Sequence, residues 1–146
     1  MQTRVLVPSG VLGLGFDSDA LASGVAAGPD IIAIDGGSTD SGPFYLGTGT
    51  SKYSRSVCRD EWRQLLEARA AASVPLVIGS CGTCGTASTV DWMFEITCDL
   101  AAELGQTLRV ARLYSDVSVE ALRHARDADR LTPLHPVQAI DDSALA

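Results

Sequence analysis

The stretch PLVIGSCGTCGTASTVDWMFEITCDLAAELG, residues 75–105, contains the pattern on which the predicted fold depends. It begins with a short aliphatic run that has no alternating polar face, which is typical of a strand covered on both sides. A loop of small residues follows over 79–86, and Ser88 and Asp91 then have the spacing of a helix-capping box. Apolar side chains recur at helical spacing from there until Gly105. The stretch therefore predicts a strand, a glycine-rich loop and a helix.

The same succession of elements recurs along the chain. Aliphatic runs predict strands at residues 4–7, 30–34, 75–78 and 108–113. Helical spacing and capping residues predict helices from Asp17 or Ser18 through Ala26, from Ser56 through Arg69, from Ser88 through Leu104, and from Val119 to about Asp127. We interpret Asp60 and Glu61 as acidic residues favoured by the dipole at the start of the second helix.

This alternation predicts the fold class and the organisation of the chain. Strands alternating with helices favour an α/β fold, in which a parallel, Rossmann-like sheet has helices on both faces. Residues 1–132 are expected to form this domain. Residues 133–146, which begin with two closely spaced prolines, are expected to connect it to a further C-terminal part or to a partner chain.

Composition excludes several classes of protein. The chain has 146 residues, 46% of them apolar, which suits one domain with a buried core. Its 18 acidic and 11 basic residues give a net charge of −7 without a basic run, which argues against binding to nucleic acid. No apolar stretch approaches the roughly 18 residues that cross a bilayer, and no secretory signal opens the chain. We therefore expect a cytoplasmic protein that binds no membrane.

Small and polar residues follow each of the first three predicted strands. If these strands are parallel and adjacent, the loops share one rim, where glycines allow close approach of a ligand and backbone N–H groups can bind an anion. The predicted substrate-binding residues are Ser9, Gly10, Gly36, Gly37, Ser38, Thr39, Gly79, Ser80, Cys81 and Gly82. Tight turns that require positive φ are the alternative explanation for these glycines.

Two aspartates are candidates for the catalytic base. Asp35 ends an aliphatic strand and Asp40 follows five residues later, so either carboxylate could accept a proton at the rim. An Asx turn, in which the carboxylate accepts a backbone N–H, is the structural alternative. For Asp35 we favour the catalytic interpretation, whereas for Asp40 the two interpretations have equal weight.

The cysteine pair and the other glycine motifs do not identify a cofactor. Cys81 and Cys84 have the spacing of a redox or metal motif, and a helix start would lower the pKa of a thiol there. We predict no metal, because the chain has no second pair of ligands at regular spacing. A redox function and simple filling of the loop both remain open. The glycine spacing over 10–15 and the residues 47–52 match neither nucleotide-binding motif, so the cofactor is left unknown.

One long motif resembles a known family. The residues Asp35-Gly-Gly-Ser-Thr-Asp-Ser-Gly-Pro-Phe-Tyr-Leu-Gly47, with Pro75-Leu-Val-Ile-Gly-Ser80 and Pro8-Ser-Gly-Val-Leu-Gly13, resemble the N-terminal part of the acyclic terpene utilisation AtuA-like family. Members of that family are longer than this chain. Asp35, Ser38, Thr39, Asp40, Gly79 and Ser80 match the shared pattern, whereas Cys81 and Cys84 fall outside it. The resemblance implies catabolism of branched carboxylates or their coenzyme A thioesters by lyase-like chemistry.

These observations lead to three functional hypotheses. The first is the N-terminal domain or subunit of a catabolic enzyme that acts on a small branched carboxylate or acyl-CoA by lyase- or hydratase-like proton abstraction. The second is a non-catalytic binding or assembly module that completes a site with a second subunit or a C-terminal domain. The third is a thiol-based redox enzyme that uses Cys81 and Cys84.

Overall fold

The computed structural model describes residues 2–37, 41, 43–134 and 136–145. They divide into two compact units, Met1–Ser115 and Asp116–Ala146. The division comes before the last helix, whereas the sequence had suggested an α/β domain through residue 132. The described residues contain no helix with both the length and the apolar character needed to cross a bilayer.

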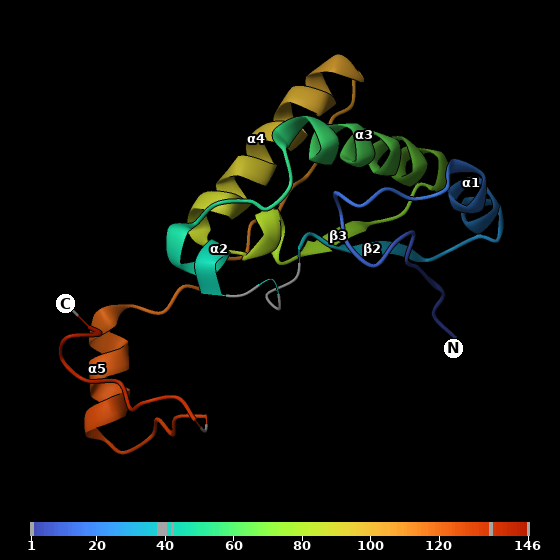
Figure 1. Cartoon of the computed structure of the whole chain (residues 1–146). Coiled ribbons are helices and arrows are strands. Elements are labelled where there is room, and N and C mark those ends of the chain that lie inside the picture. Colours follow the sequence, from blue (N-terminus) through green and yellow to red (C-terminus); the bar gives the residue numbers. More distant parts are fainter. Residues whose placement is uncertain (1, 38–40, 42, 135, 146) are drawn as a thin grey trace. The chain divides into compact units, whose positions relative to one another are not determined.

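The first unit contains a parallel sheet and most of the helices (Figure 1). Its elements are β1 (Val5–Leu6), α1 (Ser18–Ala26), β2 (Ile31–Asp35), α2 (Pro43–Thr48), α3 (Arg55–Ala72), β3 (Leu76–Gly79), the 3-10 helix η2 (Cys81–Thr83) and α4 (Ala87–Glu103). Helix starts agree with the sequence to within two residues: Asp17 caps α1, Ser54 caps α3 and Thr86 caps α4. The short helix α2 was not predicted from the sequence.

The sheet has the strand order β1-β2-β3, and all its strands run in the same direction. Val5 of β1 lies opposite Ile31, and Asp35 at the end of β2 lies opposite Gly79 at the end of β3. This confirms that the segments near residues 4, 30 and 75 lie side by side in parallel. The loops that follow them therefore leave the same edge of the sheet.

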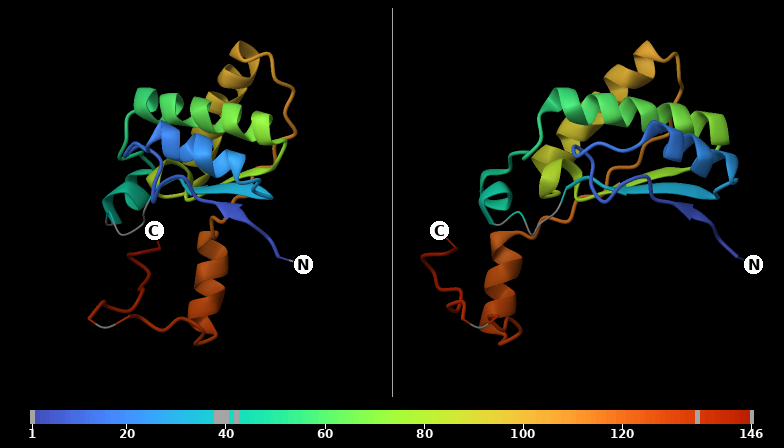
Figure 2. Two further views of the ribbon diagram at one scale, coloured as in Figure 1. Left: turned by 90° about the vertical axis from the view of Figure 1, so that its right-hand side faces the viewer. Right: turned by 45° about the vertical axis from the view of Figure 1, so that its right-hand side comes forward.

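The helices α1, α3 and α4 lie over one face of the sheet (Figure 2). Ile32 and Ile34 are almost completely buried, because they point toward these helices. Val5 and Val77 alternate with inward-facing residues and are 54% and 49% exposed. The structure thus shows a mixed α/β fold around a small parallel sheet. A Rossmann-like arrangement with helices on the second face as well stays a prediction.

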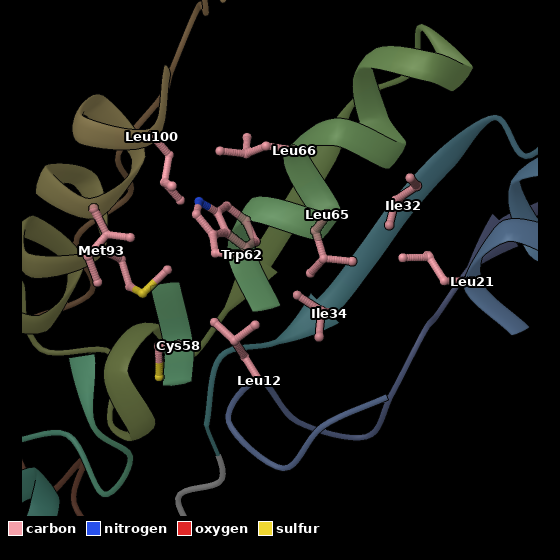
Figure 3. Packing of buried hydrophobic residues seen from close by; sticks show 11 residues of the cluster. Leu12, Leu21, Ile32, Ile34, Cys58, Trp62, Leu65, Leu66, Met93 and Leu100 are labelled. Carbon is pink, nitrogen blue, oxygen red and sulfur yellow. The ribbon is translucent and has the colours of Figure 1, made fainter. Parts of the chain in front are cut away.

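The core lies between α3, α4 and the covered face of the sheet (Figure 3). Leu65 of α3 and Leu100 of α4 are completely buried within it. Trp62 joins the two helices, since its ring is buried and its Nε1–H donates to the Thr97 hydroxyl at 2.9 Å. Burying a large aromatic side chain and satisfying its polar atom both stabilise this layer. The core therefore joins α3 and α4 to the covered face of the sheet.

The prediction of a fourth strand at residues 108–113 is wrong. Residues 108–113 have no secondary structure, and the sheet ends at β3. Arg112 instead holds this segment against α4, through an ion pair of 2.6 Å with Asp91 and a contact over the Phe94 ring at 4.4 Å. An aliphatic run alone cannot decide between pairing with a strand and packing against a helix, so the sequence signal was insufficient here.

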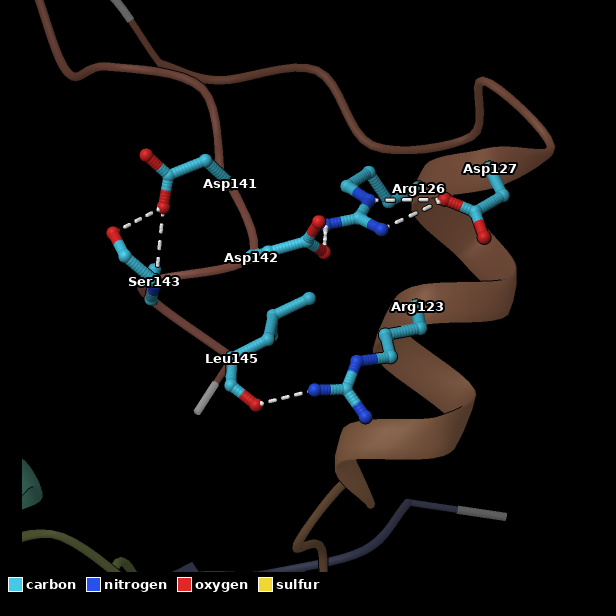
Figure 4. Close-up of polar contacts among 8 residues, drawn as sticks. Arg123, Arg126, Asp127, Asp141, Asp142, Ser143 and Leu145 are labelled. Atoms are coloured by element: carbon cyan, nitrogen blue, oxygen red, sulfur yellow. Dashed lines mark hydrogen bonds and ion pairs between the residues drawn. The ribbon is translucent and has the colours of Figure 1, made fainter.

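The second unit contains α5 (Val119–Asp127), which Ser118 caps as predicted. Arg126 lies between Asp127 and Asp142, and Arg123 donates to the backbone carbonyl of Leu145 at 2.9 Å (Figure 4). These contacts join the helix to the last residues of the chain. Most of the polar side chains that make them are exposed, so each ion pair contributes little stability.

Candidate functional site

An open hollow of about 410 Å³ lies at the carboxyl ends of the three strands. Five of the predicted site residues line it: Ser9, Gly10, Asp35, Gly79 and Ser80. The remaining lining comes from Val7, which follows β1, from Ala33 and Val77, and from Ile34, whose side chain points toward the helices. Ligands of open parallel sheets bind at this position. The hollow therefore combines hydroxyl and carboxylate groups with an apolar surface.

Asp35 is the only carboxylate among the described lining residues. Its Oδ1 accepts the backbone N–H of Gly37 at 3.0 Å, which is the Asx-type contact considered as the structural alternative. No other described residue bonds to this side chain, and the residue is exposed. The turn thus fixes the orientation of the carboxylate without occupying its second oxygen, so a structural and a catalytic role are compatible.

The described part of the protein holds neither of the two serine hydroxyls firmly. Among the described residues, the Ser9 hydroxyl makes only long contacts, of 3.4 and 3.5 Å, with the backbone of Val11. Ser80 has a left-handed backbone with φ of 47°, and no described residue bonds to its hydroxyl. A non-glycine residue in this conformation is uncommon and is often found at functional sites. Both hydroxyls can therefore reorient toward a ligand.

Gly36 and Gly37 are buried where the loop after β2 contacts the loop after β3. Neither glycine lines the hollow. The Gly36 N–H donates to the Gly79 carbonyl at 2.6 Å, and the Gly36 carbonyl accepts the Thr83 N–H at 3.1 Å. A Cβ atom added at Gly37 would lie 1.9 Å from the Thr83 Cα atom. These glycines therefore allow close approach of protein backbone, whereas we had expected close approach of a ligand.

The remaining residues of the third loop face α4. Gly82 is buried, and a Cβ atom there would lie 2.7 Å from the Thr89 Cβ atom. Cys81 packs against the core, and the Sγ atom of Cys84 lies 3.7 Å from the hydroxyls of Thr86 and Thr89. Neither Cys81 nor Gly82 is among the residues that line the hollow.

The environment of Cys81 disfavours the thiolate form of its side chain. Burial raises the pKa of the Cys81 thiol, although the nearby helix start had suggested a lowered pKa. Desolvation is the largest cause, because the side chain packs against the core, and it outweighs the backbone hydrogen bond that lowers the pKa of this thiol. The cysteines of the chain are free thiols, and Cys58 and Cys84 are buried. Within the third loop, Cys81 packs against the core and Cys84 lies beside Thr89 of α4.

A buried carboxylate that the sequence did not identify holds the first loop. Glu61 of α3 is only 7% exposed, and its two oxygens accept the N–H groups of Gly13 at 2.7 Å and Gly15 at 2.8 Å. Hydrogen bonds to a charged acceptor are stronger than neutral ones. From the sequence we interpreted Glu61 as an acidic residue favoured by the dipole at the start of the helix. It precedes Leu65 by one helical turn, which already indicated that it lies on the buried side of the helix.

Three predicted site residues, Ser38, Thr39 and Asp40, lie outside the described residues. Within the described part, no group of three or more His, Cys, Asp or Glu side chains is placed to hold a metal ion. Comparison of the chain with protein-family models, curated proteins and solved structures gives no match. The functional assignment therefore depends on the geometry of the hollow.

Proposed function

We propose that this chain is the N-terminal domain or subunit of a catabolic enzyme that binds a small branched carboxylate or acyl-CoA in the hollow. Asp35 removes a proton from the bound substrate in a lyase- or hydratase-like reaction. The observation that carries this proposal is the combination of Asp35, Ser9 and Ser80 with an aliphatic surface in one hollow at the strand ends. Such a surface suits a molecule that has a branched alkyl part and a carbonyl or carboxylate group.

Each part of the hollow has a role in this reaction. Val7 and Val77 contact the alkyl part of the substrate, while the hydroxyls of Ser9 and Ser80 donate to its carboxylate or thioester oxygen. Asp35 accepts the proton beside that carbonyl, where negative charge on the developing enolate is stabilised by the donors. The N–H of Gly37 keeps the carboxylate oriented for this step.

The resemblance to the acyclic terpene utilisation AtuA-like family belongs to the same proposal. It supports branched acyl substrates and adds Asp40 as a second candidate base, with Ser38 and Thr39 as further donors. A cytoplasmic location and a C-terminal domain or second subunit fit such a catabolic enzyme.

A second candidate function is a non-catalytic module that completes a site with another chain. The open face of the sheet favours it, because Val5, Val7 and Val77 are 54%, 60% and 49% exposed there. Apolar side chains gathered on one face of a small domain are typical of an interface. In this case the hollow binds the substrate and the partner supplies the reacting groups.

Deuterium exchange distinguishes these candidates. The full chain, incubated with 3-methylbutanoyl-CoA in D₂O, is expected to catalyse exchange of the protons beside the thioester carbonyl. The substitution Asp35→Asn is expected to slow this exchange at least about 100-fold, since a positioned base contributes about 10² to 10⁴ in rate. Mass spectrometry of the recovered thioester measures the incorporation.

The matched control is Asp60→Asn, because Asp60 is an exposed aspartate of α3 outside the hollow. It is expected to exchange at the wild-type rate. Equal rates for Asp35→Asn and the wild type would remove Asp35 from the mechanism. Binding of the thioester without any exchange would favour the assembly module over the enzyme.

A further inference from the structure

A second and larger cavity of about 850 Å³ lies beside the free edge of β3. It is lined by α3, α4 and β3 on one side and by residues 107–113 on the other. Its volume is within the range of roughly 300–1,000 Å³ that is usual for small-molecule sites. We refer to it as the edge groove. It is separate from the hollow, with which it shares only Val77.

The edge groove exists because residues 107–113 do not pair with the sheet. Ile32 donates to the Pro75 carbonyl and Gly36 donates to the Gly79 carbonyl, so alternate residues of β3 bond to β2. In a parallel ladder the residues between them, Leu76 and Ile78, direct their N–H and carbonyl groups to the other edge. No further strand of the described chain covers that edge. The segment after α4 returns past the sheet (Figure 2), and its residues 107–113 line the groove.

The interior of the edge groove is apolar. Trp62, Leu66 and Met93 are buried core residues that also line it, and the half-buried Phe94 and Leu108 extend this apolar surface. An aliphatic chain in contact with this lining would bury apolar surface on both sides, which is favourable. An aliphatic chain would supply those contacts without requiring hydrogen bonds from the walls. The shape and lining therefore suit a chain of methylene groups.

Three arginines line the edge groove, although the chain as a whole has a net charge of −7. Arg112 is paired with Asp91, and Arg69 uses its Nε–H to bond the Val74 carbonyl. Arg109 is exposed, and no described residue forms an ion pair with it. A local excess of positive charge in an acidic protein is complementary to an anion. Arg109 is thus free to bind the anionic end of a ligand.

We propose that the edge groove binds an anionic amphiphile, whose aliphatic chain lies against Trp62 and Met93 and whose anionic group bonds to Arg109. This binding site goes beyond the proposed function of the hollow and does not depend on it. Free fatty acids and acyl-CoA thioesters share this chemistry. Residues 107–113 form one wall of the edge groove, which Arg112 holds to α4 through Asp91 and which no strand pairing holds to β3.

Calorimetric titration of the full chain with decanoate, hexanoate, 1-decanol and decanoyl-CoA tests this site. Wild-type protein is expected to bind decanoate, and hexanoate more weakly, because a shorter chain fills less of the groove. The substitution Arg109→Glu is expected to weaken decanoate binding by at least about tenfold, since it replaces attraction with repulsion. Binding of 1-decanol, which carries no charge, is expected to stay the same.

The control Arg130→Glu makes the same change of net charge at an exposed residue of the second unit. It is expected to leave decanoate binding unchanged. Tighter binding of decanoate than of decanoyl-CoA would support the site with a free acid as ligand, and the reverse would support it with a thioester. Equal weakening by both arginine variants, or no binding of any probe, would overturn the proposal.

Hydrogen exchange provides an independent readout. The amides of residues 108–113 are expected to exchange rapidly in the free protein and more slowly with decanoate bound. If they are already protected without a ligand, the segment pairs with β3 and closes the groove. That result would overturn the proposal even if calorimetry detected decanoate binding, because the binding would then occur at another site.

Discussion

The substitution Gly37→Ala is expected to destabilise the first unit by at least about 3 kcal/mol, the upper part of the range for overpacked positions. The added Cβ atom would lie 1.9 Å from the Thr83 Cα atom and 2.3 Å from the Thr83 backbone nitrogen. Because both neighbours are backbone atoms, no side-chain rotation can relieve the overlap. The loops after β2 and β3 must separate, which breaks the hydrogen bond between the Thr83 N–H and the Gly36 carbonyl.

Urea unfolding of the full chain, followed by circular dichroism, measures this loss. The control is Gly47→Ala, since Gly47 lies in α2 and a Cβ atom there meets nothing within 4 Å. It is expected to leave stability unchanged or to raise it by up to about 1 kcal/mol, because alanine is the better helix former. Similar midpoints for the two variants would show that the loops do not approach each other as described.

The substitution Glu61→Gln is expected to cost about 2 to 3 kcal/mol of stability. Both carboxylate oxygens of Glu61 accept backbone N–H groups, from Gly13 and Gly15, in a buried position. A glutamine has one carbonyl oxygen, so its amide nitrogen would face a second donor and leave that N–H unsatisfied. A buried polar group without a partner costs about 1 to 3 kcal/mol, and the loss of charge weakens the remaining bond.

The matched control is Glu67→Gln, because Glu67 is an exposed residue of the same helix. Its unfolding midpoint is expected to stay within the range of ordinary surface substitutions, about 0.5 kcal/mol. Amide exchange at Gly13 and Gly15 is expected to accelerate only in the Glu61 variant. An equal and small effect of both substitutions would mean that Glu61 does not anchor the first loop.

The parallel strands and most helix starts could be predicted from the sequence because they depend on local signals. Aliphatic runs define β2 and β3, and a serine or aspartate marks the starts of α1 and α5. Right-handed connections through helices then require parallel neighbours. The common rim of the first three loops followed from that topology, and it brought Ser9, Asp35 and Ser80 to one hollow.

Other features depend on contacts between distant segments, which one sequence does not reveal. Gly36 and Gly37 approach the third loop, which is more than 40 residues away in the chain. The sequence does not reveal this contact, so we expected the glycines to allow close approach of a ligand. The pKa of Cys81 follows from its burial against the core rather than from its position before a helix. Residues 108–113 have the composition of a strand, but Arg112 pairs with Asp91 and holds the segment beside α4.

We propose above all that the hollow at the strand ends binds a small branched carboxylate. The most direct measurement is a titration of ¹⁵N-labelled full chain with 3-methylbutanoate, followed by amide chemical shifts. Saturable shifts are expected at Gly10, Asp35 and Ser80. They are expected to disappear in Gly79→Val, whose side chain enters open space in the hollow, and to persist in Gly47→Val, where the space is equally open but lies elsewhere. Shifts that are absent, scattered over the protein or unchanged in Gly79→Val would contradict binding of the carboxylate in the hollow.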